Sequence, residues 1–312
     1  MNNIPEIEIR NLSVTFNMYD RGLRQKNIKV ISNLCLKAEK GEVLAVVGSS
    51  GSGKSLLAHA IMGILPKNAV VTGSMKYKGL DITEKRIKDI RGKEICLIPQ
   101  SVSYLDPLMK VGNQVMIKNN KSCFEKMRKA FRRYDLCENS EKLYPFQYSG
   151  GMARRALIST AEQTEPSVII ADEPTPGLDR KMAYRTLKYF RDFADRGKAV
   201  IMITHDIDIA VEYADKISVF YGGTTLETTR AENFIKGEKY LYHPYTKALY
   251  NALPQNGFKA VKGFQPSPYE VSEGCIYFDR CDKRQEKCRG NIPVSVFDNG
   301  SCFVRCIYGH SV

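Results

Sequence analysis

The sequence predicts an α/β fold in which a parallel sheet carries a phosphate-binding loop. Three observations lead to this prediction. Residues 46–61 run from an apolar stretch through a glycine- and serine-rich loop into an apolar helix. Short apolar runs, typical of buried parallel strands, recur at 167–173 and 198–205. Helical sequence alternates with these runs, and such alternation builds parallel sheets.

The individual elements follow in order along the chain. Residues 7–16 alternate apolar and polar side chains and are expected to form a strand, and residues 29–47 are expected to form two more, broken at Lys40 and Gly41. Helices are predicted at 152–164, 180–197 and 208–214, and a further strand at 216–223. Basic, mostly helical sequence at 101–147 interrupts the alternation and suggests an inserted arm. The alternation ends near residue 240, where prolines become frequent.

The loop after the strand at 42–47 has the spacing of a phosphate cradle. Glycines let successive backbone N–H groups turn into one cavity, and the following helix adds the positive end of its dipole. Lys54 would reach the terminal phosphates, and the Ser55 hydroxyl would bind Mg²⁺. The alternative is a plain turn between strand and helix, but the flanking elements are those that the motif requires. The cradle comprises Gly48, Ser49, Ser50, Gly51, Ser52, Gly53, Lys54 and Ser55.

Two carboxylates end the apolar run at 167–173. At the carboxyl edge of a sheet, Asp172 would hold Mg²⁺ through water, and Glu173 would polarise an attacking water. Acidic residues also end many strands without any catalytic role, so the phosphate loop upstream is what strengthens this interpretation. His205 ends the next apolar run and would contact a terminal phosphate, although a single histidine there is also compatible with a structural role.

A second glycine-serine turn, Tyr148 to Met152, opens the helix at 152–164. It again offers backbone N–H groups and a helix N-terminus to an anion. One nucleotide does not need two such cradles on one chain. Two chains that face each other would use both, each closing over the nucleotide of the other.

Composition limits the class of protein. The chain has 312 residues, 43% of them hydrophobic and 26% charged, as in ordinary globular proteins. No apolar run is long enough to cross a bilayer, and residues 1–10 lack a signal-peptide core, so we expect a soluble cytoplasmic protein. The net charge of +13 favours an anionic neighbour such as nucleic acid, a membrane surface or a nucleotide, or only a solvated basic surface. Nine cysteines without an export signal argue against disulfides.

The motifs together resemble those of ABC transporter ATPase subunits. They occur in that family's order over residues 5 to about 235: Walker A at Gly48–Ser55, the glutamine loop at Gln100, the signature at 148–152, Walker B at 168–172 with Glu173, the D-loop at 176–179 and the switch histidine His205. The resemblance implies a P-loop NTPase with a RecA-like parallel sheet, an antiparallel β subdomain, a short helical arm and a C-terminal cysteine-rich extension. The expected domains are residues 1–240, with the arm at about 101–147, and residues 241–312.

The resemblance also implies roles for single residues. Phe16 matches the aromatic residue that stacks on adenine, with Tyr19 as a weaker candidate. Lys54 and the loop amides would bind the phosphates. Ser55, Gln100 and Asp172 would form the Mg²⁺ shell. Glu173 would be the general base, and His205 would be the γ-phosphate sensor. The residues that would meet the partner chain and its ATP are Ser149, Gly150, Gly151 and Asp179. The D-loop departs from the family's usual pattern, because Pro176 and Gly177 precede Leu178 and Asp179.

Two segments resemble the oligopeptide, dipeptide and nickel importer group. They are the lead-in Tyr144-Pro145 before the signature and residues 243–254, which begin that group's C-terminal extension. The resemblance implies an ATP-driven importer of peptides, with nickel or a nickel chelate as the alternative cargo. It further implies a second, related ATPase subunit, two transmembrane permease subunits and an extracellular solute-binding protein, with this chain at the cytoplasmic face of the membrane.

Five cysteines crowd into residues 275–306. Four of them, Cys275, Cys281, Cys288 and Cys306, match a pattern of the same group that is thought in some members to hold an iron–sulfur cluster. Four thiolates in a reducing compartment suit a [4Fe–4S] cluster or Zn²⁺, although the C-x2-C pairs usual for zinc are absent. The alternative is four free thiols in a small packed extension, with Cys302 as an extra.

Two other classes compete with a transporter motor. The basic charge suggests an ABC ATPase associated with nucleic acid, but residues 101–147 are too few for the coiled coil of the repair type. Only one Walker A motif is present, whereas the ribosome-binding type carries two cassettes. We therefore expect no nucleic-acid partner. A regulatory protein that senses redox state through its cysteine tail is the third hypothesis.

Overall fold

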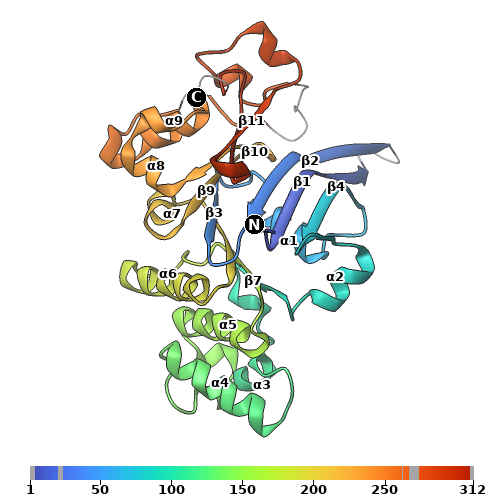
Figure 1. Cartoon of the computed structure of the whole chain (residues 1–312). Coiled ribbons are helices and arrows are strands. Elements are labelled where there is room, and N and C mark those ends of the chain that lie inside the picture. Colours follow the sequence, from blue (N-terminus) through green and yellow to red (C-terminus); the bar gives the residue numbers. More distant parts are fainter. Residues whose placement is uncertain (1–3, 20–23, 262, 267–273, 310–312) are drawn as a thin grey trace. The chain divides into compact units, whose positions relative to one another are not determined.

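The computed structural model describes residues 4–19, 24–261, 263–266 and 274–309 (Figure 1). The chain divides into two compact units. The first contains residues 1–39, 44–82 and 204–312, and the second contains residues 40–43 and 83–203. The expected boundary at residue 240 stays a prediction, because residues 241–312 group with the N-terminal strands.

An antiparallel sheet begins the first unit. Its strands are β1 (Ile7–Tyr19), β2 (Gln25–Ala38), β4 (Ala69–Tyr77) and β5 (Leu80–Asp81), in the order β2-β1-β4-β5. Alternate residues of β1, such as Ile7 and Ile9, are fully or almost fully buried, which is why its sequence alternates. The strand expected at 7–16 is therefore confirmed and extends three residues further.

A second group of strands in the first unit combines parallel and antiparallel pairs. Strand β3 (Val43–Val47), which lies in this unit except for its first residue, pairs parallel with β9 (Lys216–Tyr221). Strand β9 pairs antiparallel with β10 (Thr224–Arg230). On its other side β10 pairs antiparallel with β12 (Cys302–Arg305), and β12 pairs antiparallel with β11 (Val294–Phe297). The helices of this unit are α1 (Lys54–Met62), α7 (Ile207–Tyr213), α8 (Ala231–Lys236) and α9 (Pro244–Ala252), with 3₁₀ turns at 238–240, 254–256, 278–280, 286–289 and 298–300.

The C-terminal segment is attached to the N-terminal strands by polar contacts. The Arg305 guanidinium donates to the Asn33 carbonyl at 2.7 Å, and Lys37 Nζ donates to the Gly300 carbonyl at 3.0 Å. Arg230 at the end of β10 forms a paired hydrogen bond with the Asp298 carboxylate, and this pair lowers the pKa of Asp298 to about 2. The C-terminal segment is thus part of this sheet, through β11 and β12.

The second unit is a three-stranded parallel sheet with helices. Strands β6 (Ile95–Ile98), β7 (Val168–Asp172) and β8 (Ala199–Thr204) pair in the order β6-β7-β8. Every residue of β7 and β8 is buried, as expected for the apolar runs. The helices are α2 (Glu84–Ile90), α3 (Val111–Val115), α4 (Lys121–Arg133), α5 (Gly150–Thr164) and α6 (Arg180–Asp195), with 3₁₀ turns at 102–104, 140–142 and 145–147.

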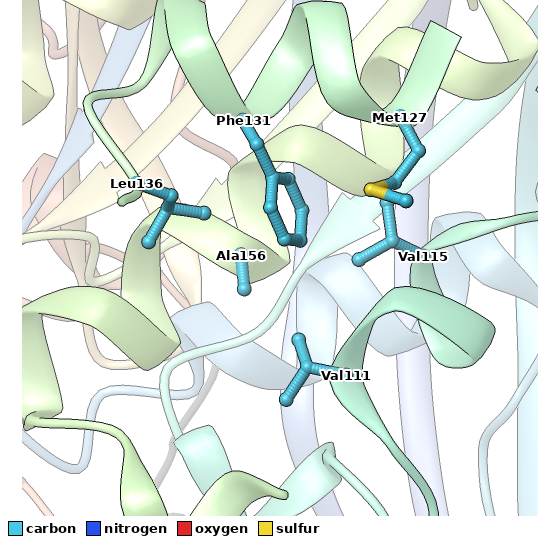
Figure 2. Close-up of a cluster of buried hydrophobic side chains, with 6 residues drawn as sticks. All are labelled: Val111, Val115, Met127, Phe131, Leu136 and Ala156. Atoms are coloured by element: carbon cyan, nitrogen blue, oxygen red, sulfur yellow. The ribbon is translucent and has the colours of Figure 1, made fainter. Parts of the chain in front are cut away.

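The arm at 101–147 has its own hydrophobic core. Side chains of α3, α4 and α5, together with Leu136 just after α4, meet in one cluster (Figure 2), and Tyr148 and Met152 pack against it. The cluster therefore joins the arm to the helix that begins at the second glycine-serine turn. Its buried members are Val111, Val115, Met127, Phe131, Leu136 and Ala156.

Two further findings concern the whole described chain. None of its helices is both long and apolar enough to span a bilayer. All nine cysteines lie within the described residues, and each is a free thiol.

Candidate functional site

The phosphate loop connects β3 to α1 in the first unit. Gly51 and Gly53 have φ of 74° and 99°, a conformation that side-chain-bearing residues rarely adopt. Gly48 is required for a different reason, because a Cβ there would lie 2.3 Å from the Phe220 carbonyl oxygen. Gly53 precedes α1 and, as a glycine, has no side chain with which to cap that helix end. Backbone N–H groups at the start of α1 can therefore donate hydrogen bonds to an anion.

Lys54 is buried and folded back on this loop. Its ammonium donates to the carbonyl oxygens of Gly48 and Ser49 at 2.9 and 2.8 Å. The Ser52 hydroxyl is also buried and has no hydrogen-bond partner among the described residues. One contact was not anticipated from the sequence: Ser49 Oγ donates to Gln265 Oε1 at 2.5 Å, which joins the loop to the C-terminal segment.

The remaining candidates of the first unit lie on strands and strand ends. Phe16 is half-buried on β1 opposite Ile28 of β2, whereas Tyr19 is 67% exposed. His205 follows β8, is exposed, and lines a shallow pocket with Leu249 and Leu253 near the end of α9.

The second unit brings Gln100 and Glu173 together. Gln100 Nε2 donates to Glu173 Oε2 at 3.3 Å. Asp172 is 6% exposed at the end of β7, and Glu173 is half-buried. Glu173 has φ of 44°, and its backbone N–H donates to the Ile203 carbonyl at 2.9 Å. The Glu173 backbone is thus held at the edge of the sheet in a left-handed conformation, which is uncommon for residues other than glycine. Such conformations concentrate at functional sites.

Arg154 is a residue that the sequence reasoning missed. It lies on α5, is 4% exposed, and donates to the Pro99 carbonyl at 2.8 Å, next to Gln100. Burial lowers the pKa of its guanidinium, and the nearby charge of Asp172 opposes that shift. A buried cation that links the glutamine loop to the Walker B carboxylate leaves no local sequence signal.

The signature turn is accessible. Ser149 caps α5 by accepting from the Met152 N–H at 3.3 Å, Gly150 is exposed, and a Cβ added to Gly150 would have no atom within 4 Å. Asp179 is likewise exposed and caps α6 by accepting from the Met182 N–H at 2.9 Å. Both turns are therefore capped but exposed, as two facing chains would need.

The four cysteines of the predicted pattern line one pocket in the first unit. The pocket is tight, with about 10 Å³ of space open to a water-sized sphere, and His243 also lines it. Burial and the proximity of the other thiols raise the pKa of Cys275 to about 11, and burial raises the pKa of Cys281 and Cys306. Within the described ranges, no three His, Cys, Asp or Glu side chains are placed to hold a metal ion together.

Comparison with known proteins assigns the family. A family model described as "ABC transporter" matches residues 31–176, and one described as "Oligopeptide/dipeptide transporter, C-terminal region" matches residues 226–288. The oligopeptide transport ATP-binding protein OppD of Salmonella typhimurium is 31% identical over 319 residues, covering 95% of this chain and 93% of the relative. The chain belongs to the ABC transporter family of ATP-binding proteins. The predicted family and the ATPase class are thereby confirmed.

One further relative and two solved structures also resemble this chain. The dipeptide transport ATP-binding protein DppD of Lactococcus lactis is 34% identical and covers 80% of the chain and 73% of the relative. A solved dimer of the ATP-binding cassette MJ0796 bound to ADP and Pi matches with a TM-score of 0.64 at 22% identity, over 72% of this chain and 98% of that one. The cbiO1 subunit from Clostridium perfringens matches with a TM-score of 0.60 at 24% identity, over 74% and 91%. These structures confirm the predicted P-loop NTPase fold.

Proposed function

We propose that the chain is the ATP-hydrolysing subunit of an importer that takes up oligopeptides or dipeptides. The observation that carries this proposal is the similarity to peptide transport ATP-binding proteins over nearly the whole chain, including the C-terminal region. The same relatives favour peptides over the alternative cargo, nickel or a nickel chelate.

In this proposal each part of the site has a chemical role. The loop at 48–53 and Lys54 bind the ATP phosphates, and Phe16 stacks on adenine. Mg²⁺, when bound with ATP, neutralises phosphate charge and is held by Ser55, Gln100 and Asp172. Glu173 takes the proton of the attacking water, and His205 contacts the γ-phosphate. The Lys54 ammonium leaves the carbonyls of Gly48 and Ser49 for phosphate oxygens, which bind it more strongly because they are charged.

A second ATPase subunit would complete the nucleotide site. The exposed turn at Ser149–Gly150 and the exposed Asp179 support this role, because both helix N-termini are open to a facing chain. We propose a related but distinct chain as the partner.

The arm would transmit closure to a permease. Apolar side chains directly after Gln100 are exposed, among them Tyr104 at 62% and Leu108 at 87%. The core in Figure 2 links this arm to the signature helix α5, so both would move together. Two permease subunits and a solute-binding protein would form the rest of the importer and hold the chain at the cytoplasmic face of the membrane.

Uptake in reconstituted vesicles tests the proposed cargo. We expect the chain, assembled with the permease and binding-protein genes that neighbour its own, to support ATP-dependent accumulation of labelled di- to pentapeptides. A Lys54→Ala variant serves as the control, because it lacks the ammonium that holds the phosphates. Accumulation of ⁶³Ni²⁺ in place of peptides would favour the alternative, and transport of neither would contradict the proposal.

We propose further that the four pocket cysteines hold a [4Fe–4S] cluster. In the described residues, no three His, Cys, Asp or Glu side chains are grouped to hold a metal ion, and this finding applies to Zn²⁺ and to a cluster alike. The four thiols nevertheless line one pocket, and this shared location is what supports the proposal. Cluster binding would also remove the thiol protons that burial otherwise retains.

Metal analysis of anaerobically purified chain tests the cluster. We expect about four iron atoms and matching sulfide per chain, with visible absorbance, and loss of both in Cys275→Ser. Cys302→Ser is the matched control, because Cys302 is buried beside Ser301 and Asp298 and does not line the pocket. If zinc is found without iron, the alternative metal replaces the cluster. If neither metal is found, the four cysteines are free thiols and the proposed cluster is contradicted.

A further inference from the structure

Another pocket of the first unit lies between strand β2 and the C-terminal segment. Strands β2, β10 and β12 line it together with the loops at 274–276 and 290–292. About 480 Å³ of it is open to a water-sized sphere, which is within the range of roughly 300–1,000 Å³ that is usual for small-molecule sites. Apart from Cys275, the functions proposed above use none of the residues that line it.

Backbone contacts already form the walls of this pocket. The Ser32 N–H of β2 donates to the Gly223 carbonyl, directly before β10, at 2.9 Å. A Cβ at Gly223 would lie 2.1 Å from the Val30 carbonyl oxygen, so these two segments pack in direct contact. The Cys275 N–H donates to the Cys288 carbonyl at 2.8 Å, which ties the loop at 274–276 to the chain just before the loop at 290–292. A ligand is therefore not needed to create the space.

Two cations line the pocket without a counter-ion among the described residues. Lys29 is exposed on β2, and Arg305 is half-buried on β12. The Arg305 guanidinium donates to the Asn33 carbonyl at 2.7 Å, which is an uncharged partner, and neither cation forms an ion pair with a described carboxylate. No Asp or Glu occurs among the described residues that line the pocket. The pocket thus has two uncompensated positive charges and favours an anion.

Two buried donors at the same pocket also lack a partner. Thr224 is 7% exposed at the start of β10, and its Oγ1 makes no hydrogen bond within the described ranges. The same is true of Nε of Arg305. Buried polar atoms are almost always hydrogen-bonded, because a group that has lost water must regain a partner. An anion with several oxygen atoms would supply acceptors for both donors.

We propose that this pocket binds a small organic molecule that carries two negative charges on carboxylate or phosphate oxygens. Arg305 and Lys29 neutralise these charges, and a guanidinium binds either kind of oxyanion through paired hydrogen bonds. The Thr224 hydroxyl donates to one of the oxygen atoms. The bound molecule joins β2 to β12 and thereby holds the C-terminal segment against the N-terminal strands.

Peptides, the proposed cargo of the importer, do not match this pocket. A peptide carries an ammonium group, which needs a carboxylate or another acceptor when it leaves water. The described lining offers two cations and no acidic side chain. The pocket is therefore a site for a different class of molecule, and the inference does not depend on which cargo is transported.

Calorimetric binding to the full-length chain tests the proposal. We expect succinate or glycerol 3-phosphate to bind, and the tighter of the two identifies the preferred oxyanion. Lys29→Glu should weaken this binding at least about tenfold, because it replaces an attractive charge by a repulsive one. Lys67→Glu is the matched control, because Lys67 is exposed in the same unit, does not line the pocket, and changes the net charge equally.

Thr224→Val separates a ligand contact from a structural role. The free chain should keep its thermal stability, because the deleted hydroxyl has no described partner and valine suits a strand. Binding of the preferred anion should nevertheless weaken about tenfold, the usual loss for a hydrogen bond to a charged group. Lower stability with unchanged binding would overturn the role of Thr224 in the site.

The phosphate loop also attracts phosphate esters, so Lys54→Ala is measured in parallel. Affinity that is unchanged in Lys54→Ala and lower in Lys29→Glu would support the pocket, whereas the reverse would place the anion on the loop and overturn the proposal. Equally tight binding of the zwitterion glycylglycine, or binding of neither dianion, would also overturn it. In the unmodified chain, the bound anion should slow amide exchange in β12, and unchanged exchange there would contradict the proposed position.

Discussion

Replacing Glu173 with glutamine is expected to lower ATP turnover at least about a hundredfold, the usual loss for a missing general base, while ATP binding persists. Glutamine has nearly the same shape but cannot take a proton from water. The neighbouring Gln100, whose Nε2 lies 3.3 Å from Glu173 Oε2, can still bond to the new side-chain oxygen. The left-handed backbone at residue 173 and its bond to the Ile203 carbonyl do not depend on the side-chain charge.

Single-turnover hydrolysis and nucleotide binding measured on the same preparation would check this result. Glu125→Gln is a matched control, because Glu125 is exposed on α4 in the same unit and remote in sequence from the site. If the proposed facing subunit exists, the Glu173→Gln chain should also accumulate as a closed, ATP-bound dimer. Unchanged turnover would show that another group accepts the proton.

Local sequence predicted the parts of the fold that local chemistry determines. The loop at 48–55 needs positive φ at residues 51 and 53, and the glycines at these two positions indicate that conformation in the sequence itself. The buried strands β7 and β8 are apolar throughout, so their sequence differs from that of any surface element. Gln100, Asp172 and Glu173 could be placed because each follows a strand or motif that already fixes its position.

Long-range pairings could not be predicted in the same way. Strand β12 has only the four residues 302–305 and joins β10, more than seventy positions earlier, through pairs such as Glu227 with Val304. Nothing in so short a run specifies its partner. Arg154 was missed for the same reason, since its significance depends on which buried groups surround it. The residues at 243–254 were recognised only by resemblance.

Glu227 is expected to make the attachment of the C-terminal segment weaken as pH rises from about 4.5 to about 7. It is fully buried on β10, and its carboxylate accepts from the backbone N–H groups of Tyr242 and His243, at 2.8 Å for the latter. Burial raises its pKa to about 7, and the two N–H donors only partly offset this. The folded state therefore binds a proton over this pH range that the unfolded segment has already released.

The sign and size of the effect follow from this difference in proton binding. Stability from the protonated Glu227 is fully present below about pH 4.5 and is lost as pH rises through the folded pKa near 7. The shift corresponds to a loss on the order of 3 kcal/mol in the free energy of opening. Amide exchange at Tyr242 and His243, corrected for its intrinsic pH dependence, would measure it.

Glu227→Gln isolates this contribution from every other titrating group. The amide oxygen still accepts from the backbone, but the side chain stays neutral, so the decrease between pH 4.5 and 7 should largely disappear. Glu232→Gln on α8 is the matched control, because Glu232 is half-exposed and paired with Lys236, and should leave the profile unchanged. A profile that is equally steep in Glu227→Gln would mean that another group governs the docking of α9. If instead the profile flattens, one buried carboxyl links pH to the docking of the segment that carries His243 and the cysteine pocket.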